Sequence, residues 1–348
     1  MIKKILLAKP RGFCAGVDRA IDVVETALEI FGKPIYVKHA IVHNVHVVED
    51  LEKKGAIFVE DLDEVPPLRP FDSAQDFEGQ AAKSVLVFSA HGSPPQLKEE
   101  ARKRGFRVID ATCPLVTKVH LEAKRYANEG YFIIYIGHRG HPEPIGVMGE
   151  VSKESIVLIE DASEVAGLKV PQEDKLIYLN QTTLSLSDVQ NTIDALKRRF
   201  TKIIAPPTVW DICFATSNRQ TAAKELAQKS DLVLVIGSKT SSNSNRLRDV
   251  SEAEGTKAYL VDDETMVDPK WLVGVKTLGI TSGASAPEYL VDNLVAFIQK
   301  ANPGAKVENL DVLKEEVKFP LPDDLVAIAS QTEKGAAWVE KHRVASQR

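Results

Sequence analysis

The sequence predicts an α/β protein of three pseudo-repeated α/β units, whose mainly parallel sheets form a trefoil around a central cavity. The three cysteines reveal the repeat, because Cys14, Cys113 and Cys213 are spaced by 99 and 100 residues. A short apolar run precedes each cysteine, and a segment of helical periodicity follows it. After each cysteine, further apolar runs end in clusters of polar residues. Because the carboxyl ends of parallel strands meet at one edge of a sheet, these clusters are expected to lie together. Three such edges can close around a pseudo-threefold axis.

The composition is that of an ordinary globular protein, and it excludes several functional classes. The 348 residues include 44 Lys and Arg against 49 Asp and Glu, a net charge of -5. Without a basic excess or a basic stripe, nucleic acid is not an expected partner. No run approaches the roughly 18 apolar residues of a membrane span. The apolar run at 5–8 is too short for a signal peptide, so we expect a cytoplasmic protein. The three cysteines are an odd number and lie far apart, which excludes a disulfide framework.

The first unit is expected over 1–110. Its predicted elements are a strand at 2–9, a helix at 17–32, and strands at 34–44, 55–61 and 84–95. Two of these strands end in histidines, His43 and His91. The stretch 66–83 interrupts the pattern and is rich in proline and polar residues, so it is predicted to be a surface insertion.

The second and third units repeat this order over 111–208 and 209–300. The second has expected strands at 106–112, 131–144, 155–161 and 175–185, and a helix at 114–130. The third has expected strands at 208–212, 231–245, 257–263 and 276–287, and a helix at 215–230. Residues 301–348 do not continue the repeat and are expected to be a C-terminal extension, with an added strand and turn at 317–330 and a terminal helix or frayed tail at 333–348.

The equivalent positions of the cysteines allow several chemistries. Each thiol could be a small buried side chain at a tight turn, although a chance match of all three is improbable. A structural zinc site usually needs four ligands with local pairs, and no such pair occurs. Three thiolates could hold a four-iron cluster and leave one iron without a protein ligand. A single catalytic cysteine with a histidine partner would leave two matched cysteines unexplained.

The strand ends supply many uncharged polar groups. Such groups beside helix starts make a plausible cradle for a phosphate or diphosphate, although helix capping is their alternative use. The candidates are His43, His91, His138, His141, Asn180, Thr182, Thr183, Ser241, Ser242, Asn243, Ser282 and Ser285. Glu143 lies in a Gly- and Pro-rich loop beside two histidines, where it is either an exposed acid or, inside a closed cavity, a general acid.

Nine motifs, in order between about residues 5 and 300, strongly resemble the 4-hydroxy-3-methylbut-2-enyl diphosphate reductase (IspH or LytB) family of the non-mevalonate isoprenoid pathway. They read PRGFCAGV, HNVHVV, SAHG, DATCPLV, GHRGHPE, QTTLS, DICFATSNRQ, GSKTSSNSNRL and TSGASAPE. The resemblance implies a trefoil around one [4Fe-4S] cluster, with Cys14, Cys113 and Cys213 as ligands and one open iron. It also implies an oxidoreductase that removes the allylic hydroxyl of its diphosphate substrate to give isopentenyl and dimethylallyl diphosphate.

The same resemblance implies roles for the polar residues. Glu143 would deliver the proton, with His141 at the substrate and Thr182, or its neighbour Thr183, in the hydrogen-bond network of the hydroxyl. The diphosphate would be bound by His43, His91, Ser241, Ser242, Asn243 and Ser285. Reduced ferredoxin or flavodoxin would supply the electrons.

Two hypotheses of other classes stay open at this point. A cluster-bearing sensor or scaffold on the same fold would have no evident need for the anion cradle. A zinc- or cysteine-dependent hydrolase of a phosphorylated substrate would be active in air without a reductant.

Overall fold

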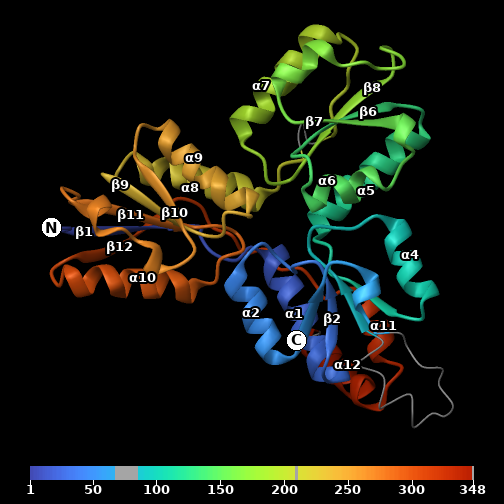
Figure 1. Ribbon diagram of the computed structural model, residues 1–348, viewed down its shortest axis with the longest axis horizontal. Coiled ribbons are helices and arrows are strands. Elements are labelled where there is room, and N and C mark those ends of the chain that lie inside the picture. The colour runs from blue at the N-terminus through green and yellow to red at the C-terminus, as the bar shows by residue number, and fades with distance from the viewer. Residues whose placement is uncertain (67–84, 208–210, 347–348) are drawn as a thin grey trace.

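The computed structural model describes residues 1–66, 85–207 and 211–346, with side chains described up to residue 341. The chain forms three lobes, each built on one sheet (Figure 1). All strand pairs in these sheets are parallel, and helices cover their faces. The predicted fold class is therefore confirmed. The predicted insertion at 66–83 lies, apart from its first residue, outside the described residues.

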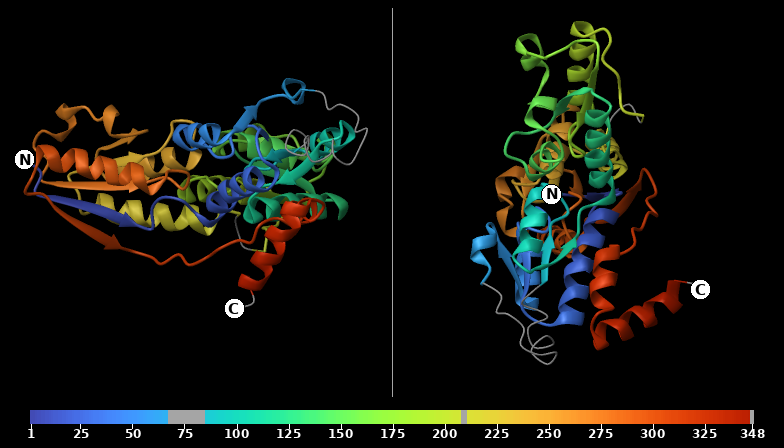
Figure 2. Two further views of the ribbon diagram at one scale, coloured as in Figure 1. Left: turned by 90° about the horizontal axis from the view of Figure 1, so that it is seen from below. Right: turned by 90° about the vertical axis from the view of Figure 1, so that its right-hand side faces the viewer.

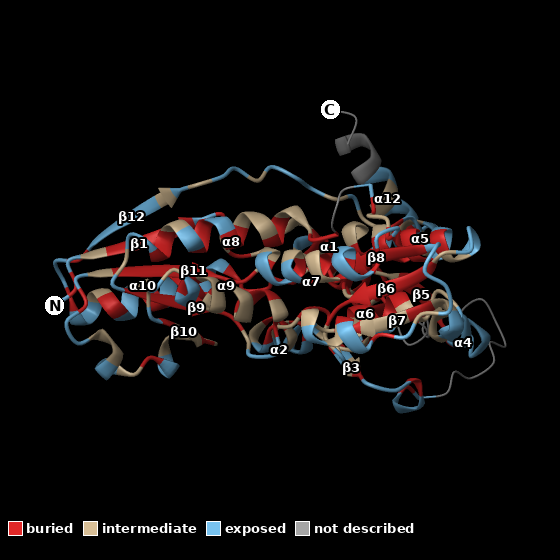
Figure 3. Cartoon of the chain, turned by 90° about the horizontal axis from the view of Figure 1, so that it is seen from above, coloured by how far each residue is buried: buried red, intermediate tan, exposed pale blue. Residues whose placement is uncertain are grey.

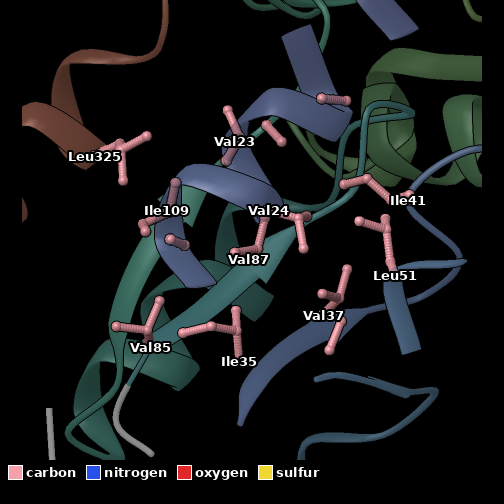
Figure 4. Close-up of a cluster of buried hydrophobic side chains, with 14 of the residues drawn as sticks. Val23, Val24, Ile35, Val37, Ile41, Leu51, Val85, Val87, Ile109 and Leu325 are labelled. Carbon is pink, nitrogen blue, oxygen red and sulfur yellow. The ribbon is translucent and has the colours of Figure 1, made fainter. Parts of the chain in front are cut away.

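The first lobe has a sheet in the order β3-β2-β4-β5. Its strands are β2 (Ile35–Lys38), β3 (Ala56–Val59), β4 (Val85–Phe88) and β5 (Arg107–Asp110), and its helices are α1 (Ala15–Phe31), α2 (Val45–Lys54) and α4 (Pro95–Lys103), with a 3-10 turn at Leu62–Glu64. Helix α1 packs Val23 and Val24 onto Ile35, Val87 and Ile109 of the sheet (Figure 4). This core fixes the direction of α1, and hence the position of the residue that precedes it.

The second lobe has a sheet in the order β7-β6-β8. Its strands are β6 (Phe132–Ile136), β7 (Ile156–Ile159) and β8 (Leu176–Asn180), and its helices are α5 (Pro114–Asn128), α6 (Pro142–Met148) and α7 (Leu186–Arg199), with 3-10 turns at Lys153–Ser155 and Ala162–Gly167. Val119 and Ala123 of α5 pack against Ile133 and Ile177 of this sheet, as α1 does in the first lobe.

The third lobe has a sheet in the order β10-β9-β11-β1-β12. Its strands are β1 (Lys4–Lys9), β9 (Leu232–Ile236), β10 (Ala258–Val261), β11 (Thr277–Ser282) and β12 (Lys306–Asp311), and its helices are α8 (Phe214–Ala227), α9 (Ser242–Ala253) and α10 (Glu288–Ala301), with 3-10 turns at Glu264–Met266 and Pro269–Leu272. Small side chains of α8, Ala222 and Ala223, pack closely on Leu6 and Val233.

The strands before Cys14 and Cys113 belong to the sheet of the preceding lobe, which corrects the expected first unit. Strand β5, before Cys113, completes the first sheet, and β1, before Cys14, lies between β11 and β12 in the third. Before Cys213, the described residues show a single bridge from Ile204 to Ile177 of the second sheet. Each cysteine therefore stands where the chain leaves one lobe and enters the next. The repeat in the sequence does not show which of two neighbouring lobes a strand joins. The boundaries expected for the second and third units, 111–208 and 209–300, remain a proposal.

The C-terminal extension connects two lobes. After β12, an extended segment runs along the outside of the molecule to α11 (Asp323–Ala329) and α12 (Glu333–Ser346) beside α1 (Figures 2 and 3). The strand and turn expected at 317–330 are wrong, because 323–329 is helical. Pro322 and two acids of the first turn favour the helix start, and Leu325 and Ala329, one turn apart, enter the first core. Within the described part of the chain, no helix is long and apolar enough to cross a membrane.

Candidate active site

A cavity lies where the three lobes meet, and side chains from all three line it. The structure brings together every residue that the family resemblance implies for the site: Cys14, Cys113, Cys213, His43, His91, His141, Glu143, Thr182, Thr183, Ser241, Ser242, Asn243 and Ser285. Three other strand-end residues, His138, Asn180 and Ser282, do not line it. His138 instead lies 3.0 Å from the guanidinium of Arg246, and Asn180 accepts a hydrogen bond from the amide of Asp211.

The three cysteines occupy equivalent positions at the N-caps of α1, α5 and α8. Their backbone amides also make equivalent hydrogen bonds. Cys14 donates to the carbonyl of Ala284, at 3.2 Å, and Cys113 to that of Ala90, at 3.0 Å. Cys213 donates to the carbonyl of Thr182, at 3.1 Å. Each acceptor lies two residues beyond the end of a strand, β11, β4 or β8 respectively, so the pseudo-threefold relation extends to single hydrogen bonds.

The three thiols line the same cavity. A Cβ atom at Gly16 would lie 2.5 Å from Cys113 Sγ and 3.9 Å from Cys14 Sγ, so only glycine fits there. The amide of Thr216 donates to Cys213 Sγ at 3.3 Å. Sequence reasoning missed Thr216; its position three residues after an N-cap is the signal that could have found it.

Burial, followed by the nearby Cys14 thiol, raises the pKa of the Cys113 thiol to about 12 and that of Cys213 to about 11. As free groups these thiols stay protonated at neutral pH. A metal centre would supply the positive charge that stabilises three thiolates in a buried site. Soft sulfur ligands select iron-sulfur clusters, zinc or copper. The donor set therefore fits a thiolate-bound metal centre.

Glu143 is the one carboxyl group among the described lining residues, and it is 2 % exposed. It stands in the first turn of α6, where its amide donates to Nδ1 of the N-cap His141 at 3.2 Å. Its Oε1 accepts from the amide of Thr182 at 2.7 Å, and its Oε2 from the Thr182 hydroxyl at 3.0 Å. Burial raises the pKa of Glu143 to about 7, against the lowering effect of the two Thr182 bonds. Such a carboxyl can hold or release a proton near neutral pH.

Three imidazoles form the first part of a polar wall. The ring centroid of His43 lies 4.1 Å from that of His91 and 5.2 Å from that of His141. Burial, followed by repulsion from neighbouring imidazoles that include His39, lowers the pKa of His43 to about 4, that of His141 to about 3, and that of His91 well below its ordinary value. The rings are therefore neutral at pH 7, and an entering anion would favour their protonation.

Hydroxyl and amide groups of the third lobe complete the wall. Ser241 is the N-cap of α9, and its Oγ accepts from the amide of Ser244 at 3.2 Å. Asn243 accepts from the amide of Ala284 at 2.8 Å, while its buried Nδ2 has no hydrogen-bond partner. Ser285 Oγ donates to the carbonyl of His43 at 3.0 Å and so links the first and third lobes. No lysine or arginine is among the described residues that line the cavity, so an anion there would be bound by dipoles and imidazoles.

Comparisons with known proteins agree on one family. Residues 5–299 match the LytB protein family. The chain is 52% identical over 322 residues to the 4-hydroxy-3-methylbut-2-enyl diphosphate reductase of Azoarcus sp. (strain BH72), covering 92% of this chain and 97% of that relative. It is 50% identical over 330 residues to the reductase of the same name from Bordetella bronchiseptica, covering 95% and 96%.

Two solved structures are also similar. The E-1-hydroxy-2-methyl-but-2-enyl-4-diphosphate reductase from Plasmodium falciparum has a TM-score of 0.86 at 38% identity, covering 95% of this chain and 99% of that one. A structure described as (E)-4-hydroxy-3-methyl-but-2-enyl diphosphate reductase, the terminal enzyme of the non-mevalonate pathway, has a TM-score of 0.58 at 30% identity, covering 86% and 100%.

Proposed function

The chain belongs to the LytB family of 4-hydroxy-3-methylbut-2-enyl diphosphate reductases, and from this premise we propose how its cavity performs the reduction. It is an oxidoreductase of isoprenoid biosynthesis that acts on this diphosphate in the last step of the non-mevalonate pathway. In the proposed reaction the allylic C–O bond is replaced by a C–H bond and water leaves. Two electrons and two protons are consumed, and the products are isopentenyl and dimethylallyl diphosphate.

The family uses an iron-sulfur cofactor. We propose that this chain holds one [4Fe-4S] cluster through Cys14, Cys113 and Cys213, with one iron that has no protein ligand. When bound, the cluster supplies electrons and a Lewis acid for the departing hydroxyl. Gly16 leaves room for Cys113 Sγ where a Cβ would collide with it, and the hydrogen bond from the Thr216 amide positions Cys213 Sγ.

The proposed source of the proton is Glu143. In its protonated form the carboxyl can donate to the hydroxyl oxygen that leaves as water, a general acid step. The two hydrogen bonds from Thr182 fix the carboxylate plane, and the His141 cap fixes the start of the helix that carries it. The geometry favours Thr182 over Thr183 as the threonine of this network, because Thr183 Oγ1 instead accepts from Gln181 Nε2 at 3.0 Å.

The proposed diphosphate site is the polar wall of imidazole, hydroxyl and amide groups. Its members are His43, His91, His141, Thr183, Ser241, Ser242, Asn243 and Ser285. The start of α9 supports this assignment, because helix N-termini favour anions and the Asn243 amide group has an unused donor there. Reduced ferredoxin or flavodoxin is the proposed electron donor, and the cytoplasm the proposed compartment.

The observation that carries the proposal is the convergence of three thiols, one buried acid and an uncharged anion wall on a single cavity. The test is turnover of the substrate, without oxygen, by cluster-loaded protein with an artificial low-potential reductant. The proposal expects both diphosphate products and no reaction without the reductant. Activity in air without a reductant would instead support the hydrolase alternative, and substrate binding without turnover would support a sensor.

A further inference from the structure

A fourth histidine, His39, lies beside the proposed diphosphate site but does not line the cavity. Its ring centroid is 5.9 Å from that of His43 and 6.0 Å from that of His91. In this group of three histidines, one ring nitrogen from each lies within 4.8 Å of the others. The group comes from the ends of two neighbouring strands, β2 and β4, so the first sheet itself holds the three rings together.

The backbone and the hydrogen bonds of His39 are unusual. Its φ of 63° is left-handed, and among the described residues it is the only one other than glycine with a positive φ. Such conformations cluster at active sites and ligand-binding sites. Its Nδ1 lies 2.8 and 3.1 Å from the two carboxylate oxygens of Glu60. An ionised carboxylate only accepts, so Nδ1 carries a proton, and the neutral ring has its lone pair on Nε2.

In each of the three histidines, one ring nitrogen makes no hydrogen bond to another described residue and is available to a metal. His39 Nε2 and His43 Nε2 are both buried and have no hydrogen-bond partner. His91 Nδ1 lies 3.3 Å from Ser89 Oγ, which leaves Nε2 for a ligand. A metal-bound histidine usually donates its other N–H to a carboxylate or another acceptor, and the His39–Glu60 pair has this arrangement before any metal is considered.

We propose that His39, His43 and His91 form a site for a divalent transition metal of the zinc class, with Glu60 orienting His39. Three neutral imidazoles suit zinc, whereas magnesium and calcium prefer oxygen ligands. Tetrahedral zinc with nitrogens at about 2.0 Å places them roughly 3.3 Å apart, so rotations that move the nitrogens by about 1 Å complete the site.

The metal and the diphosphate exclude each other. This step rests on the proposed function, which places His43 and His91 in the diphosphate site, where an imidazole binds an anion through its N–H groups. An imidazole nitrogen that coordinates zinc has no proton to donate at that atom. Zinc is therefore an inhibitor that competes with substrate, and a chelator relieves the inhibition.

The test uses cluster-loaded enzyme. Zinc and iron per chain are measured by elemental analysis after equilibrium dialysis against a series of free zinc concentrations. A metal buffer keeps the free zinc equal with and without inorganic pyrophosphate, because pyrophosphate itself binds zinc. The variants are His39→Gln, Glu60→Gln and, as a matched control, His46→Gln, which changes a histidine of the same lobe that lies 3.3 Å from Asp263. We expect one zinc per wild-type chain with iron retained, at least a tenfold loss of zinc affinity in H39Q and E60Q, and no loss in H46Q. With a chelator present, H39Q should keep its turnover.

Unchanged zinc affinity in H39Q would overturn the site. Zinc uptake with an equal loss of iron would also overturn the site, because zinc would then have replaced iron at the cysteine thiolates. Zinc that depends on His39 but is not displaced by pyrophosphate would leave the metal site standing and reject the competition, and with it the assignment of His43 and His91 to the diphosphate. The two proposals can thus fail separately.

Discussion

Thr182 holds both oxygens of Glu143, through its amide at 2.7 Å and its hydroxyl at 3.0 Å. The carbonyl of the same threonine accepts the amide of Cys213. One residue at the end of β8 therefore positions both the acid and the loop that carries one thiol. This coupling places a proton donor and a metal ligand at a fixed separation, although helices of two different lobes carry them.

The substitution Glu143→Gln should lower turnover by about 10²- to 10⁴-fold, the range that a positioned general acid contributes. The amide keeps the shape of the side chain but cannot deliver a proton, so iron content and substrate affinity should change little. Single-turnover kinetics without oxygen, together with iron analysis, measure these effects. Turnover close to that of the wild type would remove Glu143 from the proposed role.

The stability of the protein should depend on pH through Glu143. Burial raises its pKa from an ordinary value of 4.5 to about 7 in the folded state. Between these values the folded state binds more protons than the unfolded state, so the contribution to stability is full below pH 4.5 and is lost as pH rises through 7. In urea unfolding, E143Q should therefore gain stability relative to wild type between pH 5.5 and 8.5, by a few kcal/mol at most. An equal pH dependence in both proteins would contradict this account of the carboxyl.

Binding of a diphosphate should take up protons. Burial lowers the pKa of His43 to about 4 and that of His141 to about 3, so both are neutral near pH 7, and the charge of the ligand favours their protonated forms. Calorimetry with inorganic pyrophosphate in buffers of different ionisation heat should show this uptake, and affinity should weaken from pH 6 to pH 8. The substitution His141→Gln should reduce the uptake and so separate it from the ionisation of the ligand. Heats that do not depend on the buffer would exclude the imidazoles as charge partners of the diphosphate.

The substitution Gly16→Ala should disrupt the cluster site, because the added Cβ would lie 2.5 Å from Cys113 Sγ. We expect at least half of the bound iron to be lost while the lobes remain folded. Gly167→Ala is the matched control, since a Cβ there meets nothing within 4 Å. Iron content and circular dichroism of both variants measure the effect. Full iron content in G16A would show that the thiols are not held as closely as the structure indicates.

The sequence predicted the features that follow from the spacing of the repeat and from the rule that the carboxyl ends of parallel strands meet at one edge of a sheet. The spacing of Cys14, Cys113 and Cys213 and the polar ends of the strands were enough to place the site at one edge of three sheets. Periodicity does not say which sheet a strand joins, and the exchange of β1 into the third lobe was therefore missed. The helix at 323–329 was missed because a short apolar run reads equally well as a strand.

Single contacts were beyond sequence reasoning for a different reason. Thr216 resembles any other threonine of a first helical turn, and only the position of Cys213 Sγ shows that its amide donates to sulfur. Likewise, His39 has no special spacing in the sequence. Its left-handed backbone and its bond to Glu60 emerge only when β2 and β3 pair.

The central claim is a cluster held by three cysteines with one iron free of protein ligands. Its most direct test is the iron and acid-labile sulfide content, with a visible spectrum, of protein purified without oxygen. The account predicts about four irons per chain and a sharp fall in each of the variants Cys14→Ser, Cys113→Ser and Cys213→Ser. A colourless chain that holds zinc or no metal and remains active in air would contradict it.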